Sequence, residues 1–89
     1  MTWIRVQDPQ LRPRFVNASS GVVVTIERER PGWREPWEAR VLLSRLGGGL
    51  KGEERSLARL SVDALVQQLN GLGLEASDVS SIVEWMLGT

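Results

Sequence analysis

In the first sixty residues, apolar and polar side chains alternate, or β-branched residues gather in short runs between turn residues. Both patterns are typical of β-strands, whose side chains point to alternate faces of a sheet. They predict strands in five segments, which are residues 2–7, 14–17, 21–30, 37–46 and 54–60. Turns are expected at residues 18–21 and at Pro31-Gly32, because proline presets φ and glycine accepts positive φ.

In residues 37–46 the spacing of the apolar side chains fits both a strand, with a period of two residues, and a helix, with a period of about 3.6 residues. As a strand, the segment places four apolar side chains on one face, those of Trp37, Ala39, Val41 and Leu43. Its apolar positions also suit a helix. The valine-rich segment 21–30 precedes it across the Pro31-Gly32 turn, and pairing of the two segments in a hairpin favours the strand.

The pattern changes at Ser61, after which apolar residues recur every three or four positions and predict helices at residues 62–70 and 78–87. The two apolar stripes consist of Val62, Leu65, Val66 and Leu69, then Val79, Ile82, Val83 and Met86. Ser61 is expected to cap the first helix and Gly71 to stop it. Ser77 or Asp78 is expected to cap the second helix, and Gly88 to end it.

Strands followed by helices indicate an α+β fold in a single domain, residues 1–89. We expect a small antiparallel sheet of three or four strands within residues 2–60, with both short C-terminal helices packed on one face. Helices of this length are not stable alone, so they must pack on the sheet, on each other or on a partner.

The composition argues against an enzyme and against a bound cofactor. The chain has no cysteine and no histidine, which removes thiolate nucleophiles, the commonest general base and the commonest metal ligands. The glycine-rich segment 47–54 contains Lys51, but Gly52 follows where a phosphate-binding loop has serine or threonine. We interpret it as a plain hairpin connection and expect no catalytic residues, no metal and no small-molecule cofactor.

No apolar run is long enough to span a membrane, and the N-terminal residues lack the apolar core of a signal peptide. We therefore expect an intracellular, cytoplasmic protein that does not bind membranes.

Charge is distributed unevenly although the net charge is zero. Residues 1–60 contain all eleven basic side chains and seven acidic ones, whereas residues 61–89 contain four acidic side chains and no basic one. Such asymmetry is typical of an interaction surface, of two halves that attract each other, or of protomers that meet head to tail. Most acids of the strand half have an arginine within two residues, which indicates a solvated face with weak ion pairs. Ten arginines against one lysine reflect either a GC-rich genome or selection for bidentate contacts.

Tryptophan and arginine cluster in residues 27–37, and both are enriched at binding hot spots. The candidate partner-binding residues are Trp33, Arg34 and Trp37, flanked by Arg28 and Arg30, with Trp85 as a further contact from the last helix. They favour a small non-catalytic interaction or regulatory protein that binds a protein partner and also self-associates as a homodimer. The alternative is a single-stranded nucleic-acid-binding protein, in which arginine and tryptophan on the sheet and loop hold phosphates and stack bases.

The two tryptophans of this segment are expected to differ. Trp37 is in phase with Ala39, Val41 and Leu43, which predicts a place in the core or at its rim. Trp33 follows directly on the turn and has no such phase, so we expect its ring to be exposed. Trp85 lies one position off the apolar stripe of its helix, which predicts partial exposure, either as a partner contact or as a cap on the edge of the core.

Overall fold

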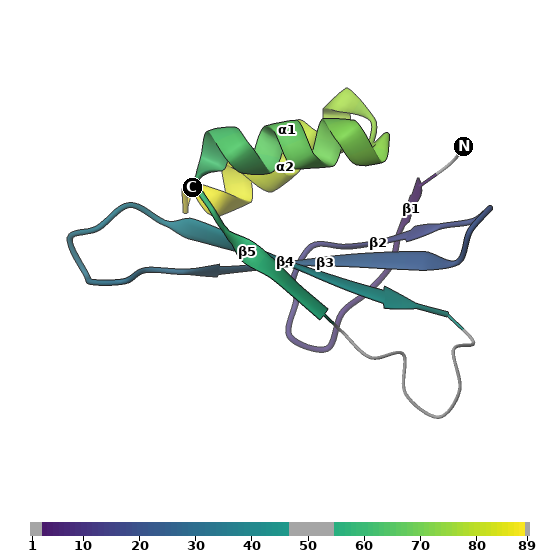
Figure 1. Ribbon diagram of the computed structural model, residues 1–89, viewed down its shortest axis with the longest axis horizontal. Coiled ribbons are helices and arrows are strands. Elements are labelled where there is room, and N and C mark those ends of the chain that lie inside the picture. Colours follow the sequence, from purple (N-terminus) through teal and green to yellow (C-terminus); the bar gives the residue numbers. More distant parts are fainter. Residues whose placement is uncertain (1–2, 47–54, 89) are drawn as a thin grey trace.

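The computed structural model describes residues 3–46 and 55–88, which form an antiparallel sheet with two helices on one face (Figure 1). The elements are β1 (Trp3–Arg5), β2 (Arg14–Asn17), β3 (Val22–Glu29), β4 (Glu38–Arg45), β5 (Arg55–Leu60), α1 (Val62–Leu72) and α2 (Ala76–Met86). The strands lie side by side in chain order. The predicted α+β architecture is confirmed, while the predicted connection at 47–54 lies outside the described residues.

The sheet has five strands in the described residues, more than the three or four predicted. Each of the five segments with a strand pattern forms one strand, including β1 at the edge, which pairs with β2. Pro9 and Pro13 interrupt the chain between these two strands, which is why the sequence pattern alone left their pairing open.

The longest pairing joins β3 to β4, where eight residue pairs run from Val22 with Arg45 to Glu29 with Glu38. Residues 38–45 are therefore a strand, as the hairpin interpretation predicted. Val24 pairs with both Phe15 of β2 and Leu43 of β4, which sets one apolar row across three strands. This row faces the helices and forms the centre of the core.

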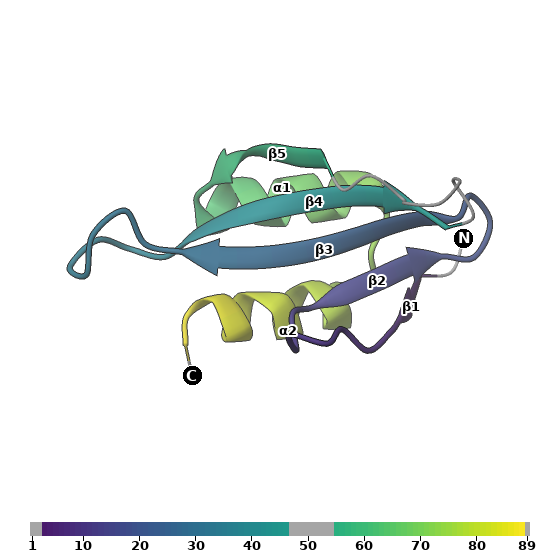
Figure 2. The same cartoon turned by 90° about the horizontal axis from the view of Figure 1, so that it is seen from below.

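Both helices cover this same face and run roughly along the direction of β3 and β4 (Figures 1 and 2). The predicted stripes supply the buried contacts, with Leu65 and Leu69 of α1 and with Val79, Ile82 and Met86 of α2. The opposite face of the sheet is not covered by either helix.

The helix boundaries correct two predictions. Ser61 caps α1 as expected, since its hydroxyl accepts a hydrogen bond from the Ala64 amide at 3.3 Å. However, α1 runs through Gly71 and ends before Gly73, which has the left-handed φ of 85°. The residue before α2 is Glu75, with no side-chain capping bond, in place of Ser77 or Asp78.

The two glycines of this region should respond to alanine in opposite directions. Alanine at Gly73 should destabilise the fold by about 1–2 kcal/mol, because a left-handed φ strains a residue with a Cβ. Alanine at Gly71 should be neutral or stabilise by up to about 1 kcal/mol, because that glycine lies within the helix. Urea unfolding of both variants measures the difference, and a shared sign would contradict the assigned helix end.

A long-range hydrogen bond connects the first strand to the end of α1. The Trp3 indole is buried, and its Nε1 donates to the carbonyl oxygen of Leu72 at 3.1 Å. Of the alternating residues in the first predicted strand, Trp3 thus joins the core, whereas Ile4 is exposed on the other face.

Candidate functional site

The connection between β3 and β4 projects beyond the sheet and the helices in both views (Figures 1 and 2). We call residues 30–37 the arm. A turn closes it, in which the Glu35 amide donates to the carbonyl oxygen of Gly32 at 3.0 Å.

The tip of the arm carries an exposed indole. Trp33 is 77% exposed, which confirms the prediction that its ring lies outside the core. The guanidinium carbon of Arg34 lies 4.8 Å from the centre of the Trp33 ring. Arg30 donates from Nη1 to the carbonyl oxygen of Trp33 at 3.0 Å, which ties the tip to the end of β3. The tip therefore presents a preformed pair of an indole and a cation.

The base of the arm rests on Trp37, which is half-buried and packs against the core. Its predicted place at the rim of the core is confirmed. The guanidinium groups of Arg28 and Arg30 lie 4.6 Å and 4.2 Å from the centre of its ring. Two cations on one indole restrict the orientation of Trp37 and of the chain that leads into the arm.

Arg28 connects this base to the end of α2. Its guanidinium carbon lies 5.0 Å from the centre of the Trp85 ring, and its Nη1 donates to the Trp85 carbonyl oxygen at 2.6 Å. The last turn of α2 contains no basic residue of its own, so Arg28 supplies the cation that favours a helix C-terminus. Trp85 is partly buried, as predicted, and of the two places predicted for it the structure shows packing against the core.

All six predicted partner-binding residues thus lie at one end of the molecule, but their surroundings differ. Arg28, Trp37 and Trp85 form an internal stack that joins the sheet, the arm and α2. Trp33 and Arg34 extend from it into solvent, and Arg30 belongs to both groups, because it is exposed yet contacts Trp37 and Trp33.

On the face of the sheet away from the helices, one ion-pair network surrounds Asp8, in the loop between β1 and β2. Arg12 donates from Nε to Asp8 at 2.9 Å and from Nη1 to Glu27 at 2.6 Å, and Arg14 lies 3.2 Å from Asp8. Asp8 also accepts from the backbone amides of Gln10 and Arg12 at 3.1 Å each. Its side chain is fully buried. Sequence reasoning counted Asp8 only as one charge, although the pattern Asp-Pro followed by two nearby arginines carried the signal.

The environment of Asp8 changes its titration. Hydrogen bonding from the Arg12 guanidinium holds the pKa of this carboxyl well below its usual range, against the opposing effect of burial. The group is therefore charged in the folded protein at every pH near neutrality and organises the loop electrostatically.

A second network on the same face centres on Glu29. Its Oε1 accepts from Arg40 at 2.9 Å and from Arg59 at 2.7 Å. Arg40 and Arg59 are direct neighbours in the pairing of β4 with β5, so Glu29 offsets their mutual repulsion. The expected ion-paired face is confirmed for these residues, and its charges are largely neutralised within the molecule.

Both edges of the sheet are poor templates for an added strand. β1 has only three residues, and the pairing of β4 with β5 is irregular between Arg40 and Leu42. Short or irregular edge strands oppose edge-to-edge pairing. A partner is thus better placed at the arm or in a surface groove than along a sheet edge.

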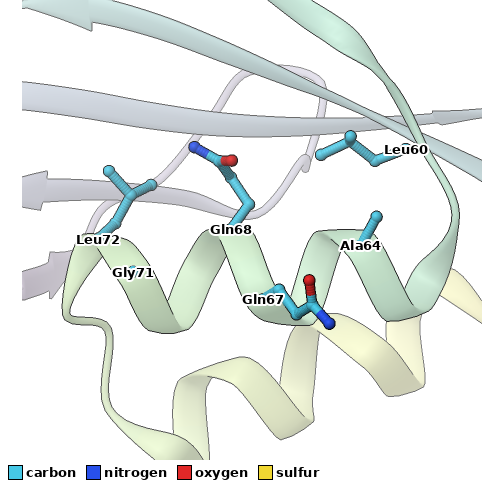
Figure 3. A pocket seen from close by; sticks show the side chains of 6 residues that line it. All are labelled: Leu60, Ala64, Gln67, Gln68, Gly71 and Leu72. Carbon is cyan, nitrogen blue, oxygen red and sulfur yellow. The ribbon is translucent and has the colours of Figure 1, made fainter.

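One open groove lies between the end of β5 and α1 and has a volume of about 460 Å³ (Figure 3). Leu60 lines it from β5, and the helix contributes Ala64, Gln67, Gln68, Gly71 and Leu72. Sequence reasoning missed this groove because Gly71 was interpreted as a helix stop. The available signal was the recurrence of Ala64, Gln67, Gln68 and Gly71 every three or four positions, on a face beside the apolar stripe.

Neither helix of the described chain is long and apolar enough to cross a lipid bilayer. Within residues 3–46 and 55–88, no three acidic side chains gather into a group that would hold a metal ion.

Comparison with known proteins finds no family model, no curated protein and no solved structure that matches this chain. Any function must therefore be argued from the geometry of the arm, the groove and the charged faces.

Proposed function

We propose that this is a small, non-catalytic interaction protein of the cytoplasm that binds a protein partner through the tip of the arm. The observation that carries the proposal is the 77% exposure of Trp33 beside the Arg34 guanidinium. Leaving a large aromatic ring in water forgoes the stabilisation that burial provides, and a protein surface is the usual place to recover it. Tryptophan and arginine are also the side chains that most often dominate binding energy at interfaces.

The internal stack supports a role in recognition by holding the arm in place. Trp37 is held by two arginines, and Arg28 ties the same group to the end of α2. A loop that is ordered before binding loses less conformational entropy on association. We assign partner contact to Trp33 and Arg34, with Arg30 beside them, and assign positioning of the arm to Arg28, Trp37 and Trp85.

The charge pattern favours a protein partner over a single-stranded nucleic acid. A phosphate-binding surface needs unneutralised cations, yet Arg12, Arg40 and Arg59 are engaged with carboxylates on the open face of the sheet. The Trp37 ring, which would stack a base, already contacts two guanidinium groups. These contacts leave one exposed ring, Trp33, where base-stacking platforms use several.

Replacing Trp33 with alanine should weaken partner binding at least tenfold, because an interface anchor of this kind contributes about 2 kcal/mol or more. The fold should be nearly unaffected, with unfolding free energy within about 0.5 kcal/mol, because the ring is exposed. Affinity capture from cells, followed by titration of the captured protein, measures the binding.

Leu11→Ala provides a matched control, since Leu11 is an equally exposed apolar side chain, 79% accessible, in the loop between β1 and β2. This control should keep full binding. Equal capture by Trp33→Ala and the wild type would refute the assignment. The assignment would also be refuted if no protein bound and fluorescence anisotropy at low salt showed that single-stranded DNA or RNA binds to the wild type but not to Trp33→Ala.

A further inference from the structure

We infer that the partner of the arm is a second copy of this chain. The Trp33–Arg34 tip of one copy enters the groove between β5 and α1 of the next, so that copies associate head to tail. This inference rests on the proposed function, in that the tip of the arm must be the contact surface.

The groove has a composition suited to an indole beside a guanidinium. Leu60, Ala64 and Leu72 provide apolar surface, and the amides of Gln67 and Gln68 provide hydrogen-bonding groups (Figure 3). Glutamine carbonyl oxygens accept from guanidinium groups, whereas the apolar side chains receive the ring. A volume of about 460 Å³ falls in the usual range of ligand sites, roughly 300–1,000 Å³.

Gly71 lies on the wall of this groove. It lies within α1, where glycine costs up to about 1 kcal/mol relative to alanine. A Cβ at this position would meet no atom within 4 Å, so neither close packing nor a left-handed φ requires glycine here. Alanine would therefore fit at this position without closing the groove, and only a longer side chain would fill it.

Charge supports the same pairing. Asp63 lies one helical turn before Gln67 on α1 and is exposed, which places a carboxylate on the side of the helix that Gln67 occupies. Asp63 is the acidic residue of α1, which has no basic residue, whereas the arm carries Arg30 and Arg34 against Glu35. Arg34 at the tip of one copy can thus pair with Asp63 beside the groove of the next.

The arm projects away from the body at one end of the sheet, so its tip does not lie in the groove of its own molecule (Figures 1 and 2). That groove begins at Leu60, which pairs with Ala39 near the base of the arm, and extends along α1 to Leu72. Donor and acceptor are different surfaces, so the contact is heterologous and adds copies in succession. One arm in one groove is a small interface, which makes the association weak and dependent on concentration.

Two complementary variants test the mode of association. Trp33→Ala removes the anchor and keeps the groove, whereas Gly71→Arg keeps the anchor and fills the groove with a side chain that also repels Arg34. Gly71→Ala is the matched control, because a methyl group leaves the groove open. Sedimentation velocity over a concentration series should show growing assemblies for the wild type and Gly71→Ala. Each of the two blocked variants alone should be monomeric, with self-association weakened at least tenfold.

The decisive sample is an equimolar mixture of the two blocked variants. In this mixture Gly71→Arg contributes the intact arm and Trp33→Ala the intact groove. The two variants should therefore form a heterodimer and no larger assembly. A wild type that stays monomeric at millimolar concentration overturns the inference, as does a mixture that stays monomeric or a Gly71→Arg variant that associates like the wild type. Gln67→Arg provides a second block of the groove if Gly71→Arg does not fold. If the wild type is monomeric while Trp33→Ala still loses a captured protein, the proposed function stands and this inference alone fails.

Discussion

Replacing Asp8 with alanine should destabilise the fold by about 3 kcal/mol, the low end of the range for a broken buried ion pair. The substitution removes the carboxylate that two guanidinium groups and two backbone amides contact, although Arg12 keeps Glu27 and Arg14 keeps the Thr25 hydroxyl. The low end applies because Arg12 and Arg14 keep some exposure and can turn toward water. Against a total stability of roughly 5–15 kcal/mol, this loss is large for a loop residue. Urea unfolding at pH 7 measures it.

The same residue predicts a pH dependence of defined sign. The folded pKa of Asp8 lies below the roughly 3.9 of an unfolded aspartate, so the unfolded state takes up the proton first. The contribution of Asp8 is therefore complete above about pH 4 and is lost as the pH falls toward the folded pKa. The stability difference between wild type and Asp8→Asn should shrink over that interval.

Glu35→Gln is a suitable control, because Glu35 is an exposed acid of the arm. It should change the unfolding free energy by less than about 0.5 kcal/mol at pH 7. An Asp8→Asn difference that stays constant from pH 7 down to pH 2 would show that the carboxylate charge is not what stabilises the loop.

Replacing Arg28 with alanine should cost about 2 kcal/mol and loosen the end of α2. The estimate combines a charged hydrogen bond to the Trp85 carbonyl oxygen with contacts to the Trp37 and Trp85 rings. Backbone amide hydrogen exchange should rise at the end of α2, where Leu87 and Gly88 donate to the last helical carbonyls. Hydrogen exchange with mass spectrometry resolves this local change.

Arg34→Ala is the control for this effect. Arg34 also lies over a tryptophan ring, but at the exposed tip, where such a contact contributes little to the stability of the fold. It should leave exchange at the end of α2 unchanged. Arg28→Lys keeps the charge and loses the planar group, so it should fall between alanine and the wild type. If Arg28→Ala and Arg34→Ala lowered the unfolding free energy equally and raised exchange at the end of α2 equally, the stack of Arg28, Trp37 and Trp85 would not be what holds that helix end.

Much of the fold could be predicted because the spacing of apolar residues determines which side chains of a strand or helix can be buried, and because proline and glycine favour turns. The alternation in residues 37–46 places Ala39 and Val41 on the helix-covered face, and both are fully buried. Residues 62–69 and 79–86 likewise supply the helix faces that cover the sheet. The exposure of Trp33 followed from its lack of phase with a strand.

Other features depend on contacts between distant residues and have no local signature. Helix α1 ends at Gly73 because that glycine adopts a left-handed φ. The sequence alone does not distinguish it from Gly71, since either glycine could end a helix. The internal use of Arg28 depends on α2 ending beside β3, 57 residues away in the chain. The groove between β5 and α1 likewise exists only once these two elements pack.

The hydrogen bond from Trp3 to Leu72 has a consequence for the order of events during synthesis. Its two residues are 69 positions apart, so the Trp3 indole has no acceptor at this site until α1 has been synthesised. The hairpin of β3 and β4 and the pair of helices form through contacts much closer in the chain, which close faster. β1 can pair with β2 early, because the two strands are close in the chain, but the Trp3 indole gains its Leu72 acceptor only after α1 has formed.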